Sequence, residues 1–215
     1  MAIDKDDAQS KKRKNVQKEV ISWIVTLLTA VVAALLIRTF LFEPVRVDGT
    51  SMQDTLIDTE LVFVTKPEYL ISGPKRQDVV ICRYPGRGST YFVKRLIGLP
   101  GDTIVFTYGV NEAEGRMSTT VMVNGELLDE GYLSPERNTL QYRFRELIAK
   151  DIVDISENDA RNQVTIVLGE NEYFVIGDNR DNSNDSRAQG PIGRKDIIGH
   201  VQFVFFPFNQ IRGVN

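Results

Sequence analysis

A basic cluster followed by a long uncharged run limits the fold of this chain more than any other feature. Lysine and arginine fill positions 11–14, residues 20–37 carry no charge, and after Arg38 the chain continues with further uncharged residues. If Arg38 snorkels, the apolar segment approaches the roughly 20 residues that a helix needs to cross a bilayer. We therefore expect a membrane anchor at residues 20–42, preceded by a basic tail at residues 1–19.

A cleavable targeting sequence is the alternative interpretation of this segment. The apolar core of such a sequence is about 7–15 residues long, and small residues follow it at the cleavage site. Here the run is longer, and Ala30, Ala33 and Ala34 lie inside it. The pattern favours an uncleaved, single-pass anchor in the cell membrane. The positive-inside rule then places residues 1–19 in the cytoplasm and the chain after about residue 43 on the extracytoplasmic side.

Composition excludes several classes of site and partner. The net charge of -3 gives no overall basic field that would attract nucleic acid. The only cysteine, Cys82, excludes an internal disulfide, and the only histidine, His200, leaves too few soft ligands for zinc. Cys82 lies in an apolar run and is predicted to be a small buried core residue. We expect no metal, no cofactor and no nucleic-acid partner.

Residues 43–215 are predicted to form one mainly β domain with antiparallel sheets. Short runs of β-branched and aromatic residues alternate with glycine and proline turns, and Asn124-Gly125 is typical of a hairpin tip. A polar and charged stretch at about 109–168, with one predicted helix near 141–150, indicates a small inserted subdomain. The predicted strands are residues 60–64, 78–82, 91–97, 103–107, 121–123 and 163–168.

Lys94 and Ser51 are the candidates for chemistry. Strand alternation places Lys94 on one face with Phe92 and Leu96, where burial would lower its pKa and allow the neutral amine to act as a base. Taken alone, Lys94 is more ordinary as a lysine that reaches back to solvent, and Ser51 as a loop serine. Considered together, Ser51 and Lys94 are better interpreted as a nucleophile and its base, because a serine needs a base to attack a carbonyl. His200 is better placed as a strand residue than as that base, which favours a Ser-Lys dyad.

A further predicted strand begins at Tyr173 and ends in a dense polar cluster, residues 177–187. The alternate spacing from Asp181 to Asp185 is compatible with a calcium loop, but the sixth and twelfth positions are Ser186 and Ile192 instead of glycine and glutamate. We therefore reject a calcium site. Asp185 and Arg187 are predicted instead to pair on a strand face and to support an active site.

Three segments, taken in order, resemble signature sequences of the type I signal peptidases. These enzymes are membrane-bound Ser-Lys proteases that remove signal peptides from exported proteins. The segments are residues 49–52, 94–102 and 177–187, and the resemblance covers nearly the whole chain. It implies a transmembrane helix followed by an antiparallel β-sheet catalytic domain. It also implies preprotein signal peptides from the export machinery as partners, at the phospholipid membrane.

The resemblance implies a role for each matching residue. Ser51 would be the nucleophile and Lys94 the general base. Ser183 would hydrogen-bond the lysine and orient it. Met52 would line the substrate pocket, and Gly49 would lie in the oxyanion region. The residues that would support the site's structure are Asp178, Asp185 and Arg187.

Two positions depart from the family pattern. Gram-negative members carry a serine in place of Gly49, and its hydroxyl helps to form the oxyanion hole. A backbone donor, the Ser51 amide, is therefore expected to do more of that work here. Asp54 stands where the family commonly has proline, which leaves the turn less rigid. Gly49, the single anchor and the short insertion indicate the Gram-positive branch.

Other functions fit parts of the sequence. A non-catalytic, membrane-anchored β domain would be an inactive relative, and a serine-reactive probe would not acylate its Ser51. A self-cleaving Ser-Lys repressor would need a DNA-binding domain that residues 1–19 cannot supply. The aromatic residues near the C-terminus are typical either of contact with lipid headgroups or of a closing core strand. They are Phe203, Phe205, Phe206 and Phe208.

Overall fold

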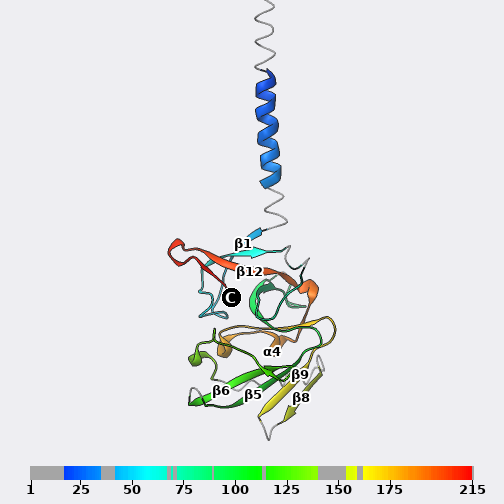
Figure 1. The fold of residues 1–215 in the computed structure, drawn as a ribbon, viewed down its shortest axis with the longest axis vertical. Helices are drawn as coiled ribbons and strands as arrows, with labels where there is room; N and C mark the ends of the chain where they lie inside the picture. Colours follow the sequence, from blue (N-terminus) through cyan, green and yellow to red (C-terminus); the bar gives the residue numbers. More distant parts are fainter. Residues whose placement is uncertain are drawn as a thin grey trace, which may run out of the picture. The chain divides into compact units, whose positions relative to one another are not determined.

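The structure is a computed structural model, and it describes residues 17–34, 42–66, 69, 72–88, 90–112, 115–139, 154–158 and 162–214. The chain divides into two compact units, Met1–Phe42 and Glu43–Asn215 (Figure 1). In the described part of the first unit, one helix, Gln17–Ala34, is long and apolar enough to cross a membrane. Its large apolar side chains, Trp23 among them, are exposed. The helix predicted near 141–150 lies outside the described residues.

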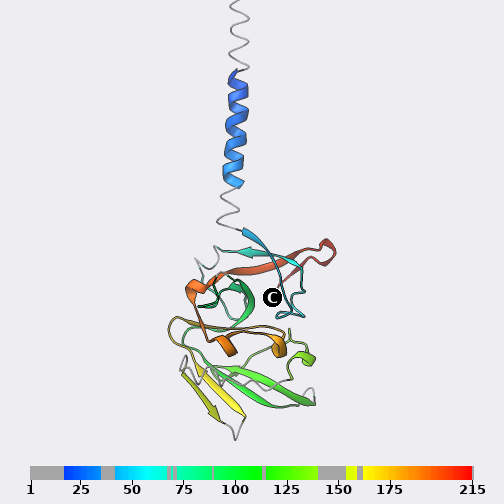
Figure 2. The ribbon, with the colours of Figure 1, turned by 180° about the vertical axis from the view of Figure 1, so that it is seen from behind.

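Within the described residues, the second unit contains two sheets, which lie at opposite ends of it in both views (Figures 1 and 2). The larger sheet has the order β1-β2-β12-β3-β4-β10-β11, with β13 paired to β12. Its strands are β1 Phe42–Arg46, β2 Leu61–Thr65, β3 Val79–Cys82, β4 Phe92–Gly98, β10 Glu172–Ile176, β11 Ile192–Gly193, β12 Ile197–Phe206 and β13 Arg212–Gly213.

The smaller sheet has the order β7-β6-β5-β9-β8, and its strand pairs are antiparallel. Its strands are β5 Thr103–Asn111, β6 Arg116–Val123, β7 Glu126–Leu127, β8 Asp154–Asn158 and β9 Gln163–Val167. Short helical turns connect the strands of the unit: η1 Pro135–Arg137, η3 Arg180–Asn182, α4 Ser186–Gln189, η4 Arg194–Asp196 and η5 Phe208–Gln210. The prediction of a mainly β, antiparallel fold behind an apolar N-terminal helix is confirmed.

The strands predicted from sequence patterns are present, with some differences in length. β5 and β6 extend beyond their predicted ends because they pair with each other continuously, from Ile104↔Val123 to Asn111↔Arg116. The Asn-Gly hairpin is confirmed, since Val123 pairs with Glu126. The smaller sheet begins at Thr103, ahead of the predicted insertion start near residue 109. The exact limits of the inserted subdomain stay a prediction.

One apolar cluster anchors the loop that follows β1. Met52 and Leu56 come from this loop and are fully buried against Val62, Val79 and Val201 of the larger sheet. Complete burial of side chains of this size contributes about 1.5–3 kcal/mol each. The loop between β1 and β2 is therefore held against the sheet by its own side chains.

A second cluster joins the two sheets. Ile97 of β4 and Phe174 of β10 pack against Ile104 and Phe106 of β5, and the rings of Phe106 and Phe174 lie 6.0 Å apart. Because β4 and β10 are neighbours in the larger sheet, this contact fixes both strands. The polar cluster of the sequence begins directly after β10.

Cys82 and His200 lie as the sequence predicted. Cys82 is fully buried in β3, and burial raises the pKa of its thiol to about 12. His200 lies in β12, where its ring stacks on Tyr69 with centroids 5.7 Å apart. The thiol and the imidazole are therefore parts of packed strands.

The aromatic side chains near the C-terminus differ in exposure. Phe203 in β12 is partly buried and stacks on Phe63 of β2 at 4.9 Å. Phe206 and Phe208 are 43% and 75% exposed, and Ile211 is exposed beside them. The end of β12 and the turn after it thus form an exposed apolar tip.

Candidate active site

Ser51 lies in the loop between β1 and β2, and its backbone is held on both sides. Gly49 N–H donates to Asp58 Oδ1 at 2.9 Å, and Asn179 N–H donates to the Ser51 carbonyl at 3.0 Å. Gly49 has a φ of +93°, which side-chain-bearing L residues rarely adopt. A serine at position 49 would therefore be strained in this backbone. The positive φ at position 49 therefore accounts for glycine, and not serine, in this chain.

Lys94 on β4 meets Ser51 directly. Its Nζ lies 2.7 Å from Ser51 Oγ and 2.9 Å from the Val93 carbonyl, and Lys94 is only 2% exposed. The ammonium also lies 5.8 Å from the centre of the Phe92 ring, on the predicted shared face. The alternative of a lysine reaching back to solvent is wrong, because the loop that carries Ser51 covers this face of β4.

Burial changes the acidity of Lys94. Removal from water disfavours the charged form and lowers the pKa of the amine below its ordinary value of 10.5. The nearby carboxylates of Asp185 and Asp178 act in the opposite direction but do not cancel the effect. A lysine with a lowered pKa, within hydrogen-bond distance of a serine hydroxyl, can serve as a base.

A cavity of about 290 Å³ opens beside this pair. Ser51 and Lys94 are among its lining residues, and Met52 lies there as the resemblance implied. The other apolar side chains that line the cavity come from β1 and the residue after it, and from β3 and β4: Val45, Val47, Ile81, Phe92 and Val93. The cavity can accept a small apolar group next to the serine hydroxyl.

Asp178 ties the turn after Ser51 to β4. The Arg95 guanidinium donates to Asp178 from Nε at 3.0 Å and from Nη2 at 2.7 Å, and both side chains are fully buried. Thr55 Oγ1 donates to Asp178 Oδ2 at 2.5 Å. Sequence analysis missed Arg95, because alternation assigned it to the face opposite Lys94, and it missed Thr55, which carries no distinctive pattern.

Asp185 and Arg187 pair, but not on a strand face as predicted. Asp185 is the N-cap of the short helix α4 and accepts from Arg187 N–H at 3.2 Å. The guanidinium donates to the same carboxylate at 2.8 and 2.6 Å, and Gly177 N–H donates to it at 3.0 Å. Burial raises the pKa of Asp185, but Arg187 and these hydrogen bonds outweigh it, so the pKa lies below its usual range. The carboxylate stays ionised at neutral pH.

Gly177 brings the end of β10 against Ser51. A Cβ at this position would collide with the Ser51 carbonyl and with Ser183 Oγ, both closer than real Cβ contacts. Ser183 Oγ, which lies beside Gly177, is also buried. Among the described residues, the hydrogen-bond partners of Lys94 Nζ are Ser51 Oγ and the Val93 carbonyl. The orienting role of Ser183 stays a prediction.

Comparison with known proteins agrees with the resemblance. The family described as "Signal peptidase, peptidase S26" matches residues 20–206 of the chain. The chain belongs to this peptidase family. Relatives of this peptidase include "Signal peptidase I" of Bacillus licheniformis, 39% identical over 94% of this chain and 96% of the relative. "Signal peptidase I S" of Bacillus subtilis is 36% identical over 95% of this chain and 100% of the relative.

A solved structure also matches the peptidase. It is a crystal structure of a signal peptidase I from Enterococcus faecalis, with 30% sequence identity and a TM-score of 0.38. The match covers 60% of this chain and 97% of that chain. The family predicted from three short segments is confirmed by the family match over residues 20–206 and by the two Bacillus relatives.

Proposed function

We propose that this chain is a membrane-bound serine endopeptidase that removes N-terminal signal peptides from exported preproteins, with Ser51 as nucleophile and Lys94 as general base. The observation that carries the proposal is the 2.7 Å contact between Lys94 Nζ and Ser51 Oγ in a buried site. The signal peptidase relatives supply the substrate class.

The reaction follows the order of an acyl-enzyme mechanism. Neutral Lys94 takes the proton of Ser51 as Oγ attacks the scissile carbonyl, and the lysine ammonium then donates that proton to the departing amine. The signal peptide remains bound to Ser51 as an ester. Lys94 next takes a proton from water as the water oxygen attacks the ester carbonyl. The bond to Ser51 Oγ then breaks, Lys94 returns the proton to Oγ, and the peptide leaves as a carboxylic acid. The Ser51 amide N–H is the expected donor to the oxyanion.

The cavity beside Ser51 supports a preference for small residues. Its volume of about 290 Å³ and its apolar lining suit an alanine side chain placed before the cleaved bond. Residues 45–49 and 91–94 both contribute to it, so an extended peptide would run beside two segments of the site. Such a peptide can add its backbone hydrogen bonds to an exposed strand edge. Small residues at the first and third positions before the cut would then face the enzyme.

The N-terminal helix and the basic residues before it support the proposed membrane arrangement. Gln17–Ala34 would anchor the peptidase, with the basic tail in the cytoplasm and residues 43–215 on the extracytoplasmic side, where preproteins leave the export machinery. Protease added to sealed, right-side-out vesicles should digest the catalytic domain and spare the tail. Protection of the catalytic domain would contradict this orientation.

The dyad is tested by replacing each of its members. Ser51→Ala and Lys94→Ala should lower cleavage by about a thousandfold or more, because each removes a group that acts in the transition state. The full detergent-solubilised chain is assayed on a preprotein with alanine at both small positions, and melting curves check the fold. Lys75→Ala, at an exposed lysine, is the matched control and should keep full activity.

The same variants test the alternative that this chain is a non-catalytic relative of the peptidases. A serine-reactive acylating probe should label the parent chain and fail to label Ser51→Ala. Undiminished cleavage in a folded Ser51→Ala or Lys94→Ala enzyme would refute the dyad.

A further inference from the structure

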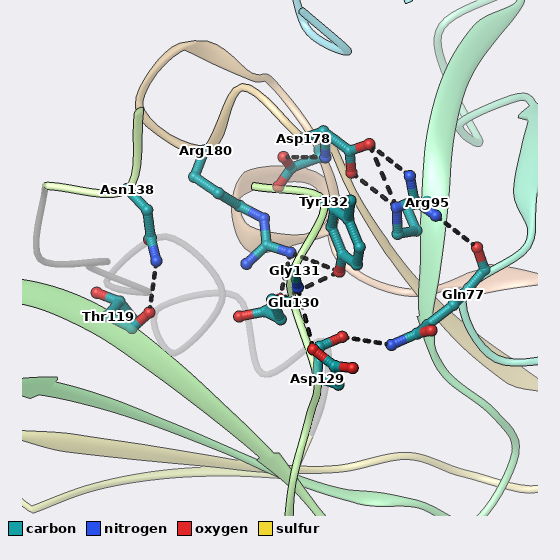
Figure 3. A network of polar contacts seen from close by, with 12 residues as sticks. Gln77, Arg95, Thr119, Asp129, Glu130, Gly131, Tyr132, Asn138, Asp178 and Arg180 are labelled. Atoms are coloured by element: carbon teal, nitrogen blue, oxygen red, sulfur yellow. Dashed lines mark hydrogen bonds and ion pairs between the residues drawn. The ribbon is translucent and has the colours of Figure 1, made fainter. Parts of the chain in front are cut away.

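Tyr132 lies in the segment that follows β7 of the smaller sheet, and its side chain contacts Arg95 and Arg180. Its ring lies between the side chains of Arg95 and Arg180 (Figure 3). The Arg95 guanidinium is 3.8 Å from the ring centre, which is close for a cation–π contact. Arg180 Nη2 donates to the Tyr132 hydroxyl at 3.1 Å, and that hydroxyl donates to Glu130 Oε1 at 3.3 Å. One aromatic side chain therefore contacts both arginines.

Each of these arginines also has a carboxylate partner. Arg95 pairs with Asp178, and Arg180 pairs with Glu130, which belongs to the same loop as Tyr132. Burial raises the pKa of the Tyr132 hydroxyl, so it stays protonated and can donate to Glu130 while it accepts from Arg180. The cluster holds equal numbers of opposite charges, and the ring separates its two cations.

The loop is fastened to β4 by a further contact. Gln77 Nε2 donates to the Asp129 carbonyl at 2.7 Å, and Arg95 Nη1 donates to the Gln77 carbonyl at 2.9 Å (Figure 3). Arg95 is therefore held by its own carboxylate partner, by the Tyr132 ring and by a backbone carbonyl that is itself linked to the loop. Movement of residues 129–132 would loosen Arg95.

Both arginines belong to segments that shape the dyad. Arg95 directly follows Lys94 in β4. Arg180 follows Asn179, whose N–H binds the Ser51 carbonyl, and the Arg180 carbonyl accepts from Arg187 Nη1 at 2.8 Å. The two arginines that Tyr132 contacts thus lie next to the segments that set the distance between Lys94 and Ser51.

We propose that Tyr132, supported by Glu130, is a positioning residue for the Ser51–Lys94 pair: it holds Arg95 and Arg180 in place and so keeps β4 and the Ser51 loop in their reactive alignment. This inference rests on the proposed function of the dyad. Tyr132 lies outside the segments that carry the family resemblance, and the contact reaches the site from the other sheet.

The test compares two substitutions at one position in the full detergent-solubilised chain. Tyr132→Leu removes both the ring over Arg95 and the hydroxyl, and we expect kcat to fall by about tenfold or more with KM within about twofold, since small misplacements of reacting groups lower kcat. Tyr132→Phe keeps the ring over Arg95 and loses the hydroxyl contacts with Arg180 and Glu130, which still pair with each other, so it should retain kcat within about threefold. We therefore expect Tyr132→Phe to keep most of the kcat that Tyr132→Leu loses.

The pH profile separates positioning from loss of folded protein. Lys94 faces the charges of Asp185, Asp178 and Arg187 and the Cys82 thiol. If Arg95 loosens, the Asp178 carboxylate is less compensated, which raises the Lys94 pKa. The acidic limb of kcat/KM should therefore move to higher pH in Tyr132→Leu and stay in place in Tyr132→Phe. A smaller folded fraction alone would lower the rate and leave the limb unmoved.

Tyr108→Leu is the matched control. Tyr108 lies on β5 of the smaller sheet, and its hydroxyl donates to the Thr139 carbonyl at 3.2 Å. Thr139 donates in turn to the Asp181 carboxylate, so this control removes an aromatic side chain linked to η3 through Thr139 and not through Arg180. Its replacement should leave kcat and the acidic limb unchanged. If Tyr132→Leu does not fold, Tyr132→Met serves as the ring-free variant and is judged by the same measurements.

Two outcomes would overturn the positioning role. One is a folded, ring-free variant with parental kcat and an unmoved limb, and the other is an equal loss in Tyr108→Leu. Neither outcome would contradict the proposed Ser51–Lys94 dyad, as long as the parent chain cleaves the preprotein and Ser51→Ala does not. A parent chain that fails to cleave, or an active Ser51→Ala, would instead reject the proposed function itself.

Discussion

At the scale of single residues, the buried amine of Lys94 predicts the pH dependence of the enzyme. Its folded-state pKa lies below 10.5 because burial disfavours the ammonium, and the proposed reaction needs the neutral amine. As pH falls through this lowered pKa, kcat/KM should drop by about tenfold per pH unit. Asp185 stays ionised across the neutral range, so the limb belongs to Lys94. A profile measured on the preprotein substrate that stays flat on its acidic side would contradict Lys94 as the base.

At the scale of elements, the fully buried Arg95–Asp178 pair connects β4 with the segment after β10, and Thr55, which donates to Asp178, links this pair to the Ser51 loop. Arg95→Met would leave the Asp178 carboxylate buried without a guanidinium, and we expect a loss of about 3–5 kcal/mol in the free energy of unfolding, measured in urea. The partly exposed pair of Arg137 and Asp54, with N and O atoms 3.0 Å apart, is the matched control. Arg137→Met should cost about 0–1 kcal/mol. If Arg95→Met and Arg137→Met lower the free energy of unfolding equally, the Arg95–Asp178 pair stabilises the fold no more than a partly exposed ion pair does.

The same elements show what the sequence can predict. The apolar run, the strand alternation and the Asn-Gly hairpin are local patterns, so the helix and the strands followed from them. Strand alternation alone left Lys94 more ordinary as a lysine that reaches solvent, and its burial was expected only once it was considered together with Ser51. Burial of Arg95 was not expected, because the loop that covers its face of β4 carries Tyr132, distant in the sequence. Gly177 was visible only as the first residue of the third segment that carries the family resemblance, with no structural reason for a glycine there. Its reason, close approach to the Ser51 carbonyl, exists only once β10 and the β1–β2 loop meet.

At the scale of the whole molecule, the division at residue 42 predicts that the catalytic unit folds without the anchor. The unit Glu43–Asn215 contains its own apolar clusters, which join its two sheets and bury the Ser51 loop. A chain that begins at residue 42 should therefore melt cooperatively and cleave a soluble preprotein. It also keeps the exposed tip formed by Phe206, Phe208 and Ile211.

That tip predicts that the catalytic unit still binds lipid. Removing an exposed phenylalanine from water contributes up to about 1.5–3 kcal/mol, so residues 42–215 should float with phospholipid vesicles, and Phe208→Ser should weaken binding by about tenfold or more. Leu127, 70% exposed in β7 of the other sheet, gives the matched control Leu127→Ser, which should float like the parent. If the parent unit stays at the bottom of the gradient, the aromatic tip does not bind lipid, and the anchor alone joins this peptidase to the membrane.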